Sequence, residues 1–158
     1  MKPFVKIEAG GLGYGSQTVG TGWSAGDLYG TVVADHKSAD GYRERSDYEL
    51  SGIDLMQGIY LNSEHTRPFE YGYQTSRGYT GYADVLTDDE MSSNPMQSYA
   101  SDERRSSTEV SVLRYKDTAL PDLSLQADYY RKNSDITYTS VSRGGTGSRT
   151  FSVLSTDG

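Results

Sequence analysis

The stretch that decides the fold is LSLQADYY at residues 123–130, because apolar and polar side chains alternate there without interruption. Leu123, Leu125, Ala127 and Tyr129 share one side, and a serine, a glutamine, an aspartate and a second tyrosine take the other. A period of two residues is typical of a β-strand with one apolar face. Weaker versions of this pattern predict further strands at residues 5–9, 10–26 (around a turn at 13–16), 28–35, 48–61, 108–117 and 150–154, with 136–141 prolonging the stretch at 123–130.

Helical periodicity is nearly absent, so we predict an all-β chain, an antiparallel meander of about six or seven long strands. Residues 48–61 would span more than ~40 Å at ~3.3 Å per residue, which is long for a strand of a globular protein. Strands of that length occur where they cross a bilayer at a tilt and project beyond it. A soluble antiparallel sheet with one wet face alternates in the same way, so this alternative stays open.

The connections between the predicted strands alternate in length. Those at 25–27 and 120–122 are short, whereas 38–47 and 65–107 are long and polar. Within the last segment, Thr87 followed by Glu90 fits a capping box that starts a short helix, which Asn94-Pro95 would end. Short turns on one rim and long loops on the other are typical of a transmembrane β-barrel. We therefore predict that 65–107 is one long outer loop.

Composition narrows the function classes. Only 34% of the residues are hydrophobic, and 18 glycines and 14 tyrosines stand beside 3 phenylalanines and 1 tryptophan, so large apolar side chains for a core are scarce. The net charge of -7 argues against nucleic-acid binding, because such binding depends on clustered lysine and arginine side chains that contact the phosphates. The chain has no cysteine, which excludes disulfides and thiol chemistry. No apolar run is long enough for a transmembrane helix, and residues 1–8 do not form a signal peptide.

No catalytic or metal-binding motif is legible. The glycines at 10–15 lack the spacing and the following helix of a nucleotide-binding loop. His36 and His65 are far apart, and the acidic residues at 88–90 do not follow the EF-hand pattern. We predict that the chain is not an enzyme and carries no cofactor and no metal.

One segment has the chemistry of a binding site. Phenols and a guanidinium gather among glycines at Tyr71, Tyr73, Arg77, Tyr79 and Tyr82. Such groups stack on flat ligands and pair with anionic chelates. The alternative is an aromatic girdle at a membrane interface, where tyrosine is common because of its mixed polarity.

Several short motifs resemble TonB-dependent outer-membrane receptors in collinear order. They are GYGS at residues 13–16, ADGYR at 39–43, RSDY at 45–48, YGY at 71–73, LTDDE at 86–90, NPMQ at 94–97 and ADYYR at 127–131. Residues 30–48 resemble an early barrel strand of that family and the loop that follows it. Residues 71–97 are similar to a long extracellular loop.

The resemblance implies that residues 1–158 form a single segment of a 22-stranded barrel in the outer membrane of a Gram-negative bacterium, without the family's plug domain or TonB box. It implies uptake of a ferric-siderophore-like chelate, cobalamin or a similar nutrient, with no transport by the segment alone. The implied partners are that ligand, outer-membrane lipid, and the remaining barrel and plug. The alternative function is a soluble or surface-exposed β-rich binding or structural module unrelated to transport.

Overall fold

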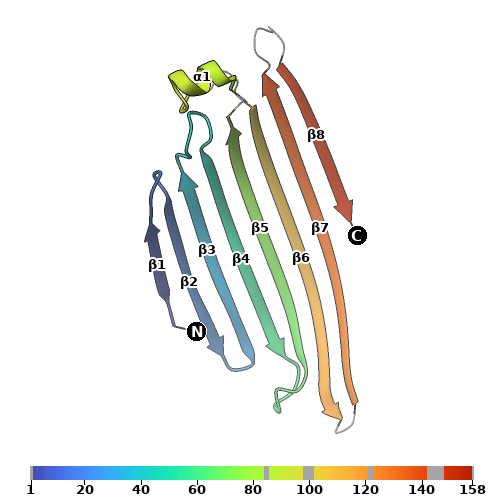
Figure 1. The fold of residues 1–158 in the computed structure, drawn as a ribbon. Helices are drawn as coiled ribbons and strands as arrows, with labels where there is room; N and C mark the ends of the chain where they lie inside the picture. The colour runs from blue at the N-terminus through green and yellow to red at the C-terminus, as the bar shows by residue number, and fades with distance from the viewer. Residues whose placement is uncertain (1, 84–85, 98–101, 121–122, 142–147, 158) are drawn as a thin grey trace.

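The chain forms one antiparallel sheet of eight strands, each hydrogen-bonded to its neighbours in sequence (Figure 1). The computed structural model describes residues 2–83, 86–97, 102–120, 123–141 and 148–157. The strands are β1 (Phe4–Ala9), β2 (Gly15–Ala25), β3 (Leu28–Ala39), β4 (Tyr48–Tyr60), β5 (Pro68–Tyr82), β6 (Asp102–Leu120), β7 (Leu123–Val141) and β8 (Ser148–Asp157). The predicted all-β antiparallel meander is confirmed.

The prediction of one long loop at 65–107 is wrong. The 15-residue strand β5 lies inside that segment, paired with β4 from Tyr48–Thr80 to Tyr60–Pro68, and β6 already begins at Asp102. The sequence hides this strand because glycine, tyrosine, serine and threonine replace the aliphatic residues on which alternation is usually recognised. Ladder hydrogen bonds need only the backbone, so two neighbouring strands can hold such a segment in the sheet.

The polar part of β7 gives a second example. Residues 131–135 interrupt the apolar alternation, yet β7 is one strand from Leu123 to Val141, and residues 131–135 pair with β6 in continuous register. β6 and β7 each have 19 residues, or about 60 Å at ~3.3 Å per residue. These strands are far longer than the usual five or six residues of globular sheets.

The helix expected after Thr87 is present as α1 (Asp88–Ser93). The Thr87 side chain accepts a hydrogen bond from the Glu90 backbone N–H, and the Glu90 carboxylate accepts one from the Thr87 N–H at 2.8 Å. Asn94 caps the other end, so the capping box and its stop are both confirmed. In Figure 1, α1 lies beyond the strand ends and covers neither face of the sheet. No helix in the described ranges is both long and apolar enough to cross a membrane.

Connections differ between the two ends of the sheet. At the short-turn end, β2 and β3 are joined by Gly26-Asp27, with Gly26 at φ +59°, and β4 and β5 by residues 61–67. At the long-loop end, the connections are 10–14, 40–47 and 83–101. The predicted short connection at 120–122 falls partly outside the described residues.

The sheet is a single layer without a core. Among the described residues, the only buried hydrophobic side chain is Leu86. Ile7 is 73% exposed and Ile53, in the middle of β4, is 48% exposed. Globular domains bury such side chains between two packed layers, and no second layer is provided by the described part of this chain.

The placement of β5 can be tested with cysteines, because the chain has none of its own. Ser76 and Thr108 are register partners on β5 and β6, so the double variant Ser76→Cys/Thr108→Cys should form a disulfide on mild oxidation. The readout is gel mobility with and without reductant. In the matched control, Ser76→Cys/Val112→Cys, the second cysteine is displaced by about 13 Å along β6 and should not react.

A positive control is Thr108→Cys/Ser134→Cys, which joins register partners on β6 and β7. If this pair forms a disulfide and the Ser76/Thr108 pair does not, β5 is not paired with β6.

Candidate functional site

The two faces of the sheet have different chemistry, which follows from strand register. One face, here called the belt face, carries nearly all the exposed aliphatic side chains of the described strands; Leu50 is the exception on the opposite, polar face. The apolar side chains of the belt face form a continuous apolar belt. Its members are Val5, Ile7, Val19, Trp23, Leu28, Val32, Ala34, Ile53, Leu55, Ile59, Phe69, Tyr71, Tyr73, Leu113, Tyr115, Leu123, Leu125, Ala127 and Tyr129.

The apolar belt crosses the strands obliquely. The register row of Ile7 on β1 continues across the sheet to Ser51 on β4 and Asp135 on β7. On β7, however, the belt begins only at Tyr129, six positions closer to the short-turn end than Asp135. The belt therefore descends by about one residue for each strand from β1 to β7.

The polar face carries a chain of charged contacts close to the short-turn end. The Tyr29 hydroxyl donates to the Glu70 carboxylate at 2.8 Å, and Arg114 lies 3.8 Å from the same carboxylate. The Arg114 Nε also donates to Asp128 at 2.7 Å, and Gln126 donates to Asp128 at 2.6 Å. Polar and charged side chains of three adjacent strands, β5 to β7, are thus linked to one another and to Tyr29 of β3. Such side chains are compatible with contact with water.

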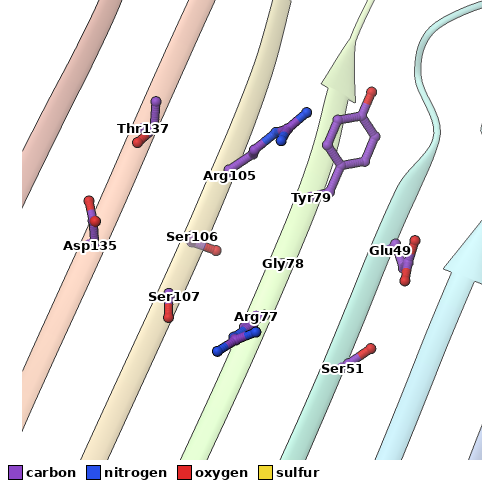
Figure 2. A pocket seen from close by; sticks show the side chains of 10 residues that line it. All are labelled: Glu49, Ser51, Arg77, Gly78, Tyr79, Arg105, Ser106, Ser107, Asp135 and Thr137. Atoms are coloured by element: carbon purple, nitrogen blue, oxygen red, sulfur yellow. The ribbon is translucent and has the colours of Figure 1, made fainter.

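On the belt face, polar side chains replace the belt towards the long-loop end of β4–β7. There they line an open hollow of about 650 Å³ (Figure 2). Its lining residues on the belt face, here called the polar band, are Glu49, Ser51, Arg77, Tyr79, Arg105, Ser107, Asp135 and Thr137. Four neighbouring strands therefore contribute to one polar surface directly beyond the apolar belt.

The two guanidiniums of the polar band differ in their contacts. Arg77 makes no hydrogen bond or ion pair with any described residue. Arg105 lies over the Tyr79 ring, 6.0 Å from its centroid, and its Nε is 3.2 Å from the Glu103 carboxylate. The Arg105 side chain is still 68% exposed, so its remaining nitrogens can reach a ligand.

The Tyr79 phenol is held in its neutral form. Partial burial raises its pKa, and the nearby carboxylates of Asp47 and Glu103 raise it further, against a smaller opposing effect of Arg105. A phenol that stays protonated donates a hydrogen bond as well as offering a flat apolar ring.

The five residues singled out from the sequence all lie on β5 and not in a loop. Tyr71, Tyr73, Arg77 and Tyr79 share the belt face, and Tyr82 points to the other. Arg77 and Tyr79 meet in the polar band, whereas Tyr71 and Tyr73 belong to the apolar belt. Gly72, Gly78 and Gly81 are strand positions, so the segment does not have the backbone freedom of a glycine-rich loop.

The sequence interpretation missed the partners that other strands bring to Arg77 and Tyr79. Arg105, Glu49 and Asp135 are far from β5 in sequence, and only the pairing register places them beside it. No local motif marks them. The two histidines take other roles: His36 Nδ1 lies 2.9 Å from the Ser51 hydroxyl, and His65 stacks on Tyr60. The described residues contain no group of three metal-ligating side chains.

Comparison with known proteins gives no relative: no family model, no curated protein and no solved structure matches the chain. The two faces of the sheet are therefore the basis on which a function can be inferred.

The contact patterns predict that Arg114 and Arg77 contribute unequally to stability. Arg114→Ala should lower the denaturant midpoint, because it leaves Asp128 and Glu70 without their cation. Arg77→Ala should leave the midpoint unchanged, because it removes no described contact. Denaturation followed by far-UV circular dichroism measures both. A larger loss for Arg77→Ala would mean that Arg77 has a structural role in the folded chain.

Proposed function

We propose that the chain is a segment of the wall of a transmembrane β-barrel, with the belt face towards lipid and the polar face towards a wet lumen. The observation that carries the proposal is the oblique apolar belt on a sheet face that no other described segment covers. In a bilayer, exposed aliphatic side chains on one face gain an apolar environment without a second protein layer.

The slope of the belt supports this proposal quantitatively. Barrel strands cross the membrane at a tilt of about 35–45°. Strands lie ~4.8 Å apart and rise ~3.3 Å per residue. At this tilt, the edge of an apolar layer parallel to the membrane would therefore shift along the strand axis by about one to one and a half residues from each strand to the next. The drift from Ile7 to Tyr129 falls at the lower end of this range.

The open edges of the sheet support a place within a larger barrel. β1 pairs only with β2, and β8 only with β7, so each edge leaves backbone groups without a ladder partner. Exposed edges invite pairing with further strands, and closure into a barrel removes them. Further barrel strands are therefore the partner that these edges fit.

The receptor class comes from the sequence motifs alone. On their resemblance, the parent barrel is a TonB-dependent receptor that imports a siderophore-like chelate or a similar nutrient across a bacterial outer membrane. In the proposed orientation Tyr71, Tyr73, Arg77 and Tyr79 point away from the lumen, and Tyr82 is the one of the five that faces it. A ligand crossing the lumen would thus meet Tyr82 and the polar face.

The lipid-facing assignment predicts opposite results for two adjacent residues of β4. Ile53→Arg places a charge in the apolar belt and should lower the free energy of unfolding from a bilayer by about 2–4 kcal/mol if the site is near the midplane. Asp54→Arg changes the polar face and should cost far less. Denaturant titration of the chain refolded in vesicles measures both values.

Equal losses for the two variants would contradict a lipid-facing belt. A chain that stays monomeric, folded and cooperative in buffer without detergent or lipid would favour the soluble β-rich module instead.

The rims should differ in access from outside the cell. With the long-loop end outwards, a cysteine at Met96 should react with a membrane-impermeant maleimide on intact cells that carry the barrel, because Met96 is exposed beyond the strands. A cysteine at Ser63, in the connection at the short-turn end, should react only after the outer membrane is permeabilised. If only the Ser63→Cys variant is labelled in intact cells, the short-turn end faces outwards and the proposed orientation is wrong.

A further inference from the structure

We propose that the polar band binds the phosphorylated sugar headgroup of a glycolipid in the membrane leaflet at the long-loop end. This inference rests on the proposed function, because it needs the belt face to be the lipid-facing side. It concerns a different surface from the lumen and a different class of ligand from the imported nutrient.

Position is the first argument. Arg77 lies on the same strand and the same face as Tyr73, four residues nearer the long-loop end, which is about 13 Å along the strand. Tyr73 is at the upper edge of the apolar belt, where aromatic rings occupy the boundary between hydrocarbon and headgroups. Side chains just beyond such an edge meet headgroups and not acyl chains.

Charge is the second argument. Arg77 and Arg105 come from adjacent strands at neighbouring register rows, and both guanidiniums face the same hollow (Figure 2). Arg77 has no described protein partner, and Arg105 is mostly exposed. The planar fork of a guanidinium pairs with phosphate through two parallel hydrogen bonds. Two such groups suit a headgroup that carries phosphate.

The other residues of the polar band point to a sugar. Glu49 and Asp135 flank the two arginines, so the surface is not a plain cationic patch that would attract any anion. Carboxylates accept hydrogen bonds from hydroxyl groups, and Ser51 and Ser107 add donors and acceptors. The neutral Tyr79 ring, which Arg105 covers from one side, offers an amphipathic surface beside them. Phosphate and hydroxyl groups occur together in a phosphorylated sugar.

The test uses the full chain with vesicles of three compositions: phosphatidylcholine alone, phosphatidylcholine with diphosphoryl lipid A, and phosphatidylcholine with phosphatidylglycerol at matched charge. Binding is measured by co-flotation. The variant Arg77→Gln/Arg105→Gln removes both guanidiniums of the polar band. The matched control Lys37→Gln/Lys116→Gln removes the same charge from the polar face.

We expect the unmodified chain to prefer vesicles with lipid A over those with phosphatidylglycerol. Each guanidinium that contacts the anionic surface should contribute about fivefold. The arginine variant should lose the preference for lipid A and keep its binding to phosphatidylcholine, and the lysine variant should keep both.

Three results would overturn the inference while leaving the proposed function standing. They are equal preference for phosphatidylglycerol and lipid A, an unchanged lipid A preference in the arginine variant, and full competition by inorganic phosphate, which would mark a site for free anions. If the unmodified chain fails to bind phosphatidylcholine vesicles at all, the proposed function fails and the inference fails with it.

Discussion

The rest of the structure depends on one constraint: the sheet is a single layer, and no other described part of the chain packs as a second layer against either face. Among the described residues the buried apolar side chain is Leu86, near α1, and not part of any strand. The hydrophobic effect stabilises a fold in proportion to the apolar area removed from water, so this sheet gains little from its own side chains. Ladder hydrogen bonds hold the strands in register but contribute modestly in water. The described part of the chain provides no cover for the belt face, and in the proposed barrel lipid takes that place along the sloping belt.

Strand register places apolar and polar side chains on two separate faces of the sheet, although the strands contain few aliphatic residues. Individually, the strands are poor in aliphatic residues: β5 has none, and β6 has its two valines on the polar face. Because β4, β5 and β6 keep an unbroken register with one another, Leu113, Tyr71 and Ile59 still lie on one face. The polar side of the same strands joins Glu70, Arg114 and Asp128 in one network. A slip of one residue anywhere would place carboxylates in the belt, so the same pattern that separates the faces also specifies the pairing.

The sequence predicted those elements in which local signals agree with the final structure. Alternation located β4 and the first part of β7, and the capping box located α1. It missed β5, because Gly72, Gly78 and the polar residues between them are typical of loops when considered locally. Only the neighbouring strands make that segment a strand. The candidate site was divided for the same reason: Arg77 and Tyr79 were recognised from their chemistry, whereas Arg105 is brought beside them by the β5–β6 register.

The position of the aromatic residues explains why a binding site and an aromatic girdle could not be separated from the sequence. Tyr71, Tyr73, Arg77 and Tyr79 follow one another at intervals of two or four residues, so they occupy one face of one strand. Along that face the environment changes from apolar at Tyr71 to polar at Arg77, where Glu49 and Asp135 replace the belt side chains. The same row of side chains thus belongs to the apolar belt at one end and to the polar band at the other, and in the proposed barrel the first part is an aromatic girdle. Tyr79 takes part in the polar band because Arg105 lies over its ring and the carboxylates of Asp47 and Glu103 are close to its hydroxyl, and Tyr71 belongs to the apolar belt because Leu113 is its register partner.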